Sequence, residues 1–462
     1  MSRPNITRRE FLRKSALLTA ALGTAGPLAL NLAMMGEAAA QTASDYKAIV
    51  CIFMVGGNDY GNTLIPYDNV NFNAYQQIRG GLAYTQSALS STVLTPRIPL
   101  PDARQMALAP ELLPIKGLFD SGAMGVLLNI GPLVQPTTLA QYFAGSVPLP
   151  PKLFSHNDQQ SFWQSDNPEG ATNGWGGRLG DMMLSSNGTS MFSGMSINGN
   201  AVFLSGNSVS QFDLTSSGAV ALKVSSQPMF TSTACSQALL SLLTQSRTNV
   251  LENAVTRMNG RGITGNAQIA AALSALPALS TTFDSKNSLA MQLKMVANLI
   301  AARSSLGVKR QVFYVSLGGF DTHTNLTETH PGLMTSVAEA ISSFYSATQE
   351  LGVANQVTSF TASDFGRTLS PNGDGSDHGW GSHHFVVGGA LQGQNFFGTL
   401  PATAVGGPDD VGQGRLLPST AIDQLGAQLA SWFGVSGGEM KTVLPYSGNF
   451  DLNTLNLFGS NS

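Results

Sequence analysis

The chain has 462 residues, only 11% of them charged, and its formal net charge is −3. Charged residues are well below the ~25% typical of globular proteins, so Ser, Thr, Asn and Gly must cover much of the surface. No dense cluster of Lys and Arg occurs, which argues against nucleic acid as a partner.

The first 40 residues predict a twin-arginine signal peptide. Arg8 and Arg9 are followed by a hydrophobic pair and an uncharged apolar stretch, and Ala38-Ala39-Ala40 offers a cleavage site. An amphipathic N-terminal helix or an uncleaved membrane anchor is the alternative. We therefore expect the Tat translocase to export the folded chain to the periplasm or beyond. Residues 41–462 would then form one domain. This part of the chain contains no apolar run of 18 residues, so we expect no membrane span in it.

Continuous apolar runs predict strands that are buried on both faces. These runs cover residues 48–55, 125–129, 311–317, 356–361 and 385–387. Helical patterns at 290–302 and 332–351 lie between them. The alternation predicts a three-layer α/β/α core with a mostly parallel sheet.

Two further features follow from the same pass along the chain. Residues 185–233 are rich in Ser, Gly and Asn and predict a β-containing insertion or cap, with a short extended piece at 201–204. A helical stretch from 236 to 303 follows. Cys51 and Cys235 could pair in an oxidising compartment. Because Cys51 lies in a predicted buried strand, a free thiol is the favoured state.

The six histidines fall in three short segments, and acidic residues accompany them beside the predicted strand ends. The acids are Asp59, Asp321, Asp364 and Asp377, and the histidines are His156, His323, His330, His378, His383 and His384. In a parallel sheet these turns would meet at one edge. Clustered carboxylates repel one another unless protons or cations intervene.

Mixed Asp and His ligands favour a transition-metal pair, Zn or Mn, with Ca or Mg second. Taken singly, each segment has another interpretation. The Asp after Gly-Gly can be a helix cap with a surface His beside it, and residues 372–377 can be an isolated calcium loop or a simple turn.

Ser155 is the candidate nucleophile, at a predicted helix start where an anion would be stabilised. A plain N-cap serine is the alternative. His156 could serve as an acid, a base or a ligand. Arg367 could hold an oxyanion such as phosphate or sulfate, or it could pair with an acid of the cluster.

These motifs together resemble a family of Tat-exported bacterial proteins of unknown function, related to the alkaline phosphatase–sulfatase superfamily. The likeness runs from about Lys47 to Phe450. It is carried by the segments 56–59, 155–163, 318–323, 363–367, 377–379 and 412–434.

The resemblance implies an alkaline-phosphatase-like core with two metals and a Ser or Thr nucleophile. By resemblance, Ser155 would be the nucleophile, and the ligands would be Asp59, Asp321, His323, Asp364 and His378. Phe365 stands where many members have His, so Asp377, His383 or His384 could supply the missing ligand. No sulfatase Cys/Ser-x-Pro-x-Arg signature is present, which disfavours a formylglycine sulfatase.

The sequence thus predicts an exported metal-dependent hydrolase that acts on phosphate or sulfate esters of small molecules or glycans. Two alternatives remain at this point. One is a non-catalytic protein that binds a surface glycan or a partner protein, and the other is a calcium-stabilised structural protein.

Overall fold

The computed structural model describes residues 43, 45–187, 189–219, 222–225 and 227–459. The expected signal peptide lies outside these residues. Within them, none of the helices is long and apolar enough to cross a membrane.

The described chain forms a nine-stranded central sheet with β1 (Lys47–Val55) in its middle. In sheet order the others are β12 (Phe396–Phe397), β4 (Met124–Gly131), β11 (Ser382–Gly388), β8 (Val357–Ser363), then β1, β7 (Arg310–Gly318), β5 (Gly194–Ser196) and β6 (Phe212–Asp213), while β13 (Thr420–Ala421) pairs with β4.

The sheet is largely parallel, as predicted. β1 pairs in parallel with β7 on one side and with β8 on the other. Among the pairings of the described sheet, those of β11 with β8 and β4 are antiparallel. Residues that precede β11 therefore lie at the same edge as residues that follow β1, β7 and β8. This direction brings the 377–379 segment to the edge where the other acidic turns lie.

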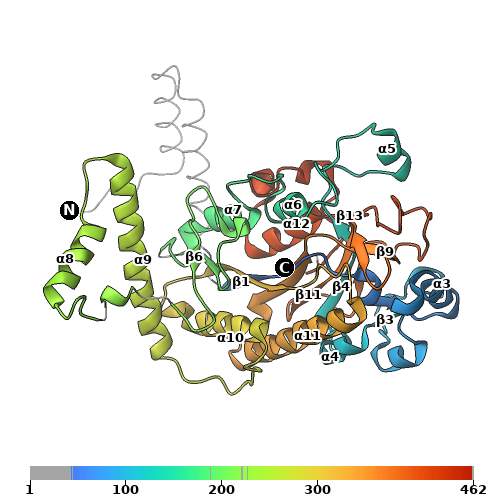
Figure 1. The fold of residues 1–462 in the computed structure, drawn as a ribbon, viewed down its shortest axis with the longest axis horizontal. Coiled ribbons are helices and arrows are strands. Elements are labelled where there is room, and N and C mark those ends of the chain that lie inside the picture. Colours follow the sequence, from blue (N-terminus) through green and yellow to red (C-terminus); the bar gives the residue numbers. More distant parts are fainter. Residues whose placement is uncertain (1–42, 44, 188, 220–221, 226, 460–462) are drawn as a thin grey trace.

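Helices cover both faces of the sheet, which gives the predicted α/β/α layers (Figure 1). Alternate residues of β1 point to opposite faces. Val50 and Ile52 join the core under α10 (Ser288–Ala301) and α11 (Leu326–Glu350). Ile49 and Phe53 join the core under α12 (Ile422–Phe433) and α7 (Trp175–Met182). This two-sided burial explains the continuous apolar run of the first strand.

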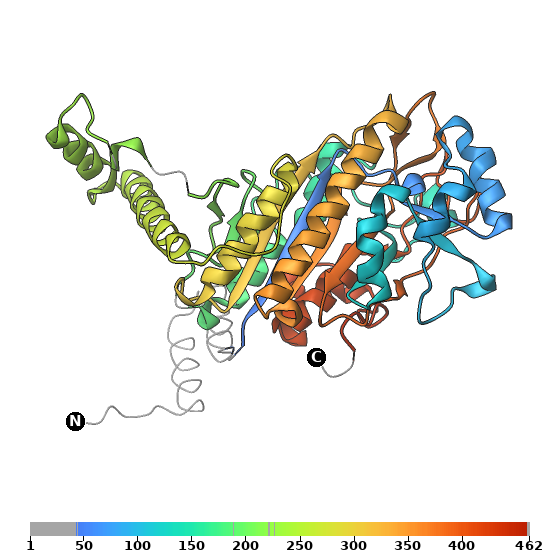
Figure 2. The ribbon, with the colours of Figure 1, turned by 90° about the horizontal axis from the view of Figure 1, so that it is seen from below.

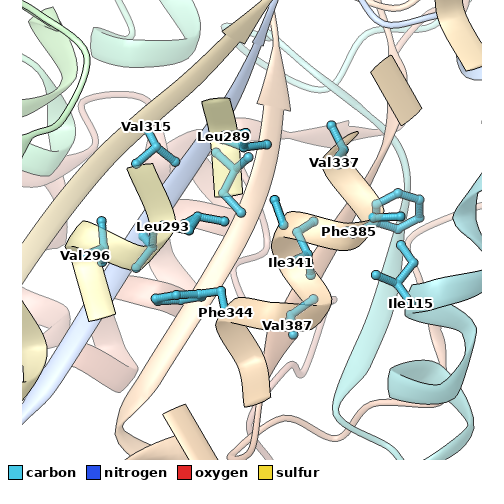
Figure 3. Close-up of a cluster of buried hydrophobic side chains, with 14 of the residues drawn as sticks. Ile115, Leu289, Leu293, Val296, Val315, Val337, Ile341, Phe344, Phe385 and Val387 are labelled. Carbon is cyan, nitrogen blue, oxygen red and sulfur yellow. The ribbon is translucent and has the colours of Figure 1, made fainter. Parts of the chain in front are cut away.

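The core beneath α10 and α11 follows from helical spacing. Val337, Ile341 and Phe344 recur at three- and four-residue intervals on one side of α11 and are buried against the sheet (Figure 3). From α10, Leu293 packs into the same cluster. Each such fully buried side chain contributes about 1.5–3 kcal/mol.

The remaining elements surround this core. The other helices are α3 (Asn69–Arg79), α4 (Leu113–Asp120), α5 (Leu139–Ala144), α6 (His156–Ser165), α8 (Thr233–Thr244), α9 (Val250–Ser274) and α13 (Met440–Val443). Two small antiparallel sheets join β2 (Leu64–Pro66) to β3 (Met106–Leu108) and β9 (Arg367–Pro371) to β10 (Ser376–His378).

The 185–233 segment, expected to be a β-containing insertion or cap, does contain strands. Its strands β5 and β6 continue the central sheet beyond β7. The apolar piece expected to be extended, Val202–Leu204, is a 3-10 turn whose Phe203 and Leu204 pack into the core under α7. Local alternation of apolar residues did not distinguish these two conformations. The helices α8, α9 and α10 follow in the stretch that was expected to be helical.

The two cysteines are both free thiols. Cys51 is buried in β1, whereas Cys235 is exposed at the start of α8. Burial raises the pKa of the Cys51 thiol well above its usual range, so this thiol is unreactive in the folded protein.

Candidate metal centre

A cluster of histidines and acids lies at the carboxyl edge of the sheet. Asp321 and His323 follow β7, and Asp364 follows β8. His378 ends β10, and His156 begins α6. Segments that are more than 200 residues apart in the sequence therefore meet at this edge, as the strand order requires.

Three imidazole Nε2 atoms surround one carboxylate oxygen. Asp321 Oδ1 lies 3.4 Å from His156 Nε2, 3.2 Å from His323 Nε2 and 3.5 Å from His378 Nε2. The Nε2 atoms of His323 and His378 are 2.8 Å apart. Ligands at ~2.0–2.1 Å from a tetrahedral Zn ion are separated from one another by about 3.3 Å. The three separations from Asp321 Oδ1 match this spacing.

Each of the three histidines is oriented through its other ring nitrogen. His156 Nδ1 lies 2.7 Å from Asp364 Oδ2, and His323 Nδ1 lies 3.3 Å from Asp377 Oδ1. His378 Nδ1 lies 2.9 Å from the carbonyl oxygen of Phe154. Because these oxygens accept hydrogen bonds, they place the imidazole proton on Nδ1 and leave the Nε2 lone pair facing the centre.

The donor set of this cluster fits a metal ion. A carbonyl oxygen can only accept, so His378 Nε2 carries no proton when the ring is neutral. His323 Nε2 lies 2.8 Å from this nitrogen, so either His323 donates a proton from Nε2 to His378 or a cation lies between the two nitrogens. Three imidazoles with one carboxylate suit Zn or Mn, whereas Ca and Mg prefer oxygen ligands. His156, Asp321 and His378 also place one ligand atom each within 4.8 Å of the others.

The ionisation of Asp321 and His378 matches this role, whereas the hydrogen bond with Asp364 raises the pKa of His156 and favours its protonated form when no ion is bound. Burial tends to raise the pKa of Asp321, but the hydrogen bond and positive charge of Arg367 outweigh it and lower that pKa. Burial lowers the pKa of His378, although the Phe154 carbonyl opposes the shift. Asp321 is therefore ionised and His378 neutral near pH 7, which are the forms that bind metal.

The centre is open to solvent on one side. The side chains of Asp321 and His323 are 48% and 41% exposed, whereas Asp364 is 2% exposed. A substrate can therefore reach the ligand atoms of the centre, while the Asp364 carboxylate, which orients His156, is shielded from solvent.

Arg367 positions Asp321 instead of facing an oxyanion. Its guanidinium is fully buried and donates to Asp321 Oδ1 at 2.9 Å and to the Gly56 carbonyl at 2.9 Å. Its Nε donates to the Ser376 carbonyl. This corrects the expectation that Arg367 holds the free oxygens of a substrate, and it supports the other interpretation, pairing with an acid of the cluster.

The conformation at Gly56 explains why a glycine follows the first strand. Its φ of +119° is unfavourable for other residues, and a Cβ there would collide with the backbone nitrogen of Asp321. Its N–H donates to Asp364 Oδ1 at 3.1 Å. The turn after β1 thus supplies backbone groups that fix Asp364.

Ser155 lies directly before His156, at the N-cap position of α6. Its side chain does not cap the helix, and its Oγ donates to Asp158 Oδ2 at 2.9 Å. The Asp158 side chain is only 3% exposed, with Lys152 Nζ at 3.6 Å from Oδ1. The plain N-cap interpretation is therefore wrong, and Ser155 carries a carboxylate partner.

Asp59 does not join the cluster, contrary to expectation. Both of its oxygens are engaged elsewhere, in a fully buried ion pair with Arg79 and in a hydrogen bond from the Gly61 N–H. The Arg79 guanidinium neutralises the charge that the family resemblance assigned to a metal.

Asp364 and Asp377 contact the outer nitrogens of His156 and His323, so they orient ligands instead of binding directly. This corrects their assignment as ligands.

The remaining histidines are buried outside the centre. His383 Nδ1 accepts from the Asn129 N–H, and His384 Nδ1 contacts Thr361 Oγ1. Burial lowers the pKa of both to about 3. Their expected role as ligands is wrong because both side chains are buried within β11, His383 against Tyr60 and His384 against Trp163. His330 is also buried, against Asn58.

The 372–377 segment is the tight turn of the β9–β10 hairpin. Asn372 N–H donates to the Gly375 carbonyl, and its side chain donates to Asp377. This geometry supports the simple turn over a calcium loop.

Sequence reasoning missed three contributors: Arg79, Asp158 and the Phe154 carbonyl. Arg79 lies in α3 with no motif around it, so nothing in the sequence pointed to it. Asp158 lies three residues after Ser155, and this spacing within one helical turn was the available signal.

A family profile described as "Protein of unknown function (DUF1501)" matches residues 46–444. The chain belongs to the DUF1501 family. No curated protein matches the sequence. The match to the family profile confirms the predicted membership in a family of unknown function.

Several solved structures are distantly similar to this DUF1501 chain. Ps i-CgsB, solved in complex with k-i-k-neocarrahexaose, is 9% identical with a TM-score of 0.36, over 89% of this chain and 78% of that one. The lipoteichoic acid synthase LtaP from Listeria monocytogenes is 8% identical with a TM-score of 0.34, over 90% and 77%. The PsFucS1 sulfatase from Pseudoalteromonas sp. is 9% identical with a TM-score of 0.34, over 93% and 73%. Similarities at such TM-scores carry no inference about function.

Proposed function

We propose that this DUF1501 protein is an exported, metal-dependent hydrolase of phosphate or sulfate esters. The observation that carries the proposal is the convergence of three imidazole Nε2 atoms on Asp321 Oδ1, with each imidazole oriented by its own acceptor. A divalent ion held there would supply Lewis-acid stabilisation of negative charge on ester oxygens. The open side of the centre leaves room for such a substrate.

Ser155 is the proposed nucleophile and Asp158 its general base. The hydrogen bond from Ser155 Oγ to Asp158 Oδ2 aligns the proton that must leave. Oγ would bond to phosphorus or sulfur, the proton would pass to Asp158, and the bond to the leaving alkoxide would break, with solvent protonating the alkoxide. Water would then cleave the serine ester and release one proton to solvent, and Asp158 would return its proton to Oγ.

The start of α6 supports an anionic substrate. Because the Ser155 side chain does not cap this helix, it accepts no hydrogen bond from the first N–H groups of α6, which lie beside His156 and carry partial positive charge. Such groups stabilise a phosphate or sulfate. The substrates would be small-molecule or glycan esters, met in the periplasm or outside the cell after export by the Tat translocase.

The test combines metal analysis with an ester panel. Protein purified without chelator is measured by mass spectrometry for Zn and Mn and assayed on p-nitrophenyl phosphate and p-nitrophenyl sulfate. We expect about one ion per chain, because Asp59, the ligand that the family resemblance implied, is instead paired with Arg79. Asp321→Asn should lose both the ion and the activity. Ser155→Ala should keep the ion and lose at least ~1,000-fold in kcat.

Asp120→Asn, on the exposed face of α4, is the matched control and should change neither quantity. A metal-loaded wild type that cleaves no ester would support a binding protein instead of a hydrolase. Calcium alone, with full activity in Ser155→Ala, would contradict the proposal.

A further inference from the structure

The helices α8 and α9 form a hairpin that projects from the end of the molecule opposite α3 (Figures 1 and 2). The two helices pack against each other. Of the buried residues of α9, Gly265, Ile269 and Ala272 lie in its second half, where it meets the body. The first half of α9 therefore extends away from the core.

This hairpin concentrates exposed apolar side chains. Of the twelve large apolar residues exposed in the described chain, five lie in the hairpin, namely Leu242, Val250, Leu251, Val255 and Met258, and two more, Leu222 and Phe230, precede α8. Leu251, Val255 and Met258 are 77%, 56% and 72% exposed and recur at positions i, i+4 and i+7 of α9. They form one stripe along the helix, which we call the α9 stripe. Thr256, which is buried, faces a different side of α9.

The charge of the segment is opposite to that of the whole protein. Residues 222–262 contain four basic residues and one acidic residue, Glu252, whereas the chain as a whole has a net charge of −3. The basic residues are Lys223, Arg247, Arg257 and Arg261. A basic helix with an exposed apolar face is suited to the surface of an anionic membrane.

We propose that the α8–α9 hairpin docks on an anionic phospholipid surface. The α9 stripe would enter the headgroup boundary, and the arginines of the segment would contact lipid phosphates. A second copy of the chain fits less well, because pairing two hairpins would bring their positive charges together. This inference does not depend on the proposed hydrolase, and the docked hairpin would leave the metal centre at a distance from the bilayer.

The experiment measures co-sedimentation of the full chain with vesicles of phosphatidylglycerol and phosphatidylcholine, and with phosphatidylcholine alone. The test variant carries Leu251→Ser, Val255→Ser and Met258→Ser. The control carries Val70→Ser, an 80% exposed residue of α3. Because all proteins carry the same first 40 residues, any binding by that segment is common to them.

A fluorophore on Cys235 reports on the hairpin itself. This thiol is exposed and lies in α8, whereas Cys51 is buried, so labelling is selective. We expect quenching by brominated phosphatidylglycerol and binding about tenfold weaker in the stripe variant. Arg257→Gln should weaken binding about fivefold at low salt.

Three results would overturn the proposal. The first is equal binding and equal quenching in the wild type and the stripe variant. The second is equal binding to neutral and anionic vesicles. The third is a concentration-dependent dimer, lost in the stripe variant, without any vesicle binding, which would assign the stripe to a second copy. Circular dichroism and gel filtration confirm that the variants, which change only exposed residues, remain folded.

Discussion

The buried Asp59–Arg79 ion pair can be tested by removing its cation. Arg79→Met keeps the length and apolar character of the side chain but leaves the Asp59 carboxylate fully buried with one remaining donor, the Gly61 N–H. Breaking a buried pair in this way costs about 3–5 kcal/mol. Arg79 also donates to the carbonyls of Thr368 and Leu369, each at 3.3 Å. Their loss adds about 1 kcal/mol, so we expect a total of about 4–6 kcal/mol.

The double variant Asp59→Asn/Arg79→Met isolates the electrostatic part of this cost. With no charge left at the site, its free energy of unfolding should return to within about 2 kcal/mol of the wild type. Urea unfolding followed by tryptophan fluorescence gives the three free energies. The metal content of the double variant should equal that of the wild type, because Asp59 is not a ligand in this structure.

Two results would refute this reasoning. A cost below about 1 kcal/mol for Arg79→Met would mean that Asp59 finds another partner or water. A double variant that folds but has lost its metal would place Asp59 in the metal centre, as the family resemblance implied.

Three further predictions follow from other groups. Three buried histidines are neutral in the folded chain: the pKa is about 4 for His330 and about 3 for His383 and His384, against 6.5 for each when unfolded. Their contribution to the free energy of unfolding is therefore fully present above pH 6.5 and is lost as the pH falls toward 4. Each adds about 1.4 kcal/mol per pH unit, so His384→Asn should flatten the pH dependence of urea unfolding by that amount, and an unchanged slope would contradict the assignment. Asp364→Asn removes the carboxylate behind His156 and should weaken metal affinity about 10–100-fold in competition with a chromophoric chelator, with Asp120→Asn unchanged as the control. Maleimide should label one thiol per native chain, Cys235, and two after denaturation, and rapid labelling of native Cys51 would contradict its burial.

The layered fold could be predicted because its signals are local. A strand buried on both faces must be apolar at every position, and this pattern marked β1, β7 and β8 within one or two residues of their observed bounds. The Val202–Leu204 turn was missed because a short buried turn needs the same apolar residues as a short strand.

The metal centre was predicted only in part, for a physical reason. Strand ends indicate which loops share an edge, so Asp321, His323 and His378 were placed correctly near one another. Which atom faces the centre depends on side-chain partners from distant segments. Arg79, in α3, decides the role of Asp59, and burial within β11 keeps His383 and His384 away from the centre. No local pattern records either effect.

X-ray absorption spectroscopy of the zinc-loaded chain tests most directly whether three imidazole nitrogens and Asp321 share one ion. We expect about one Zn per chain with four N or O neighbours at ~2.0–2.1 Å and multiple scattering from three imidazoles. A spectrum with no more than one imidazole, or with two ions per chain, would contradict it.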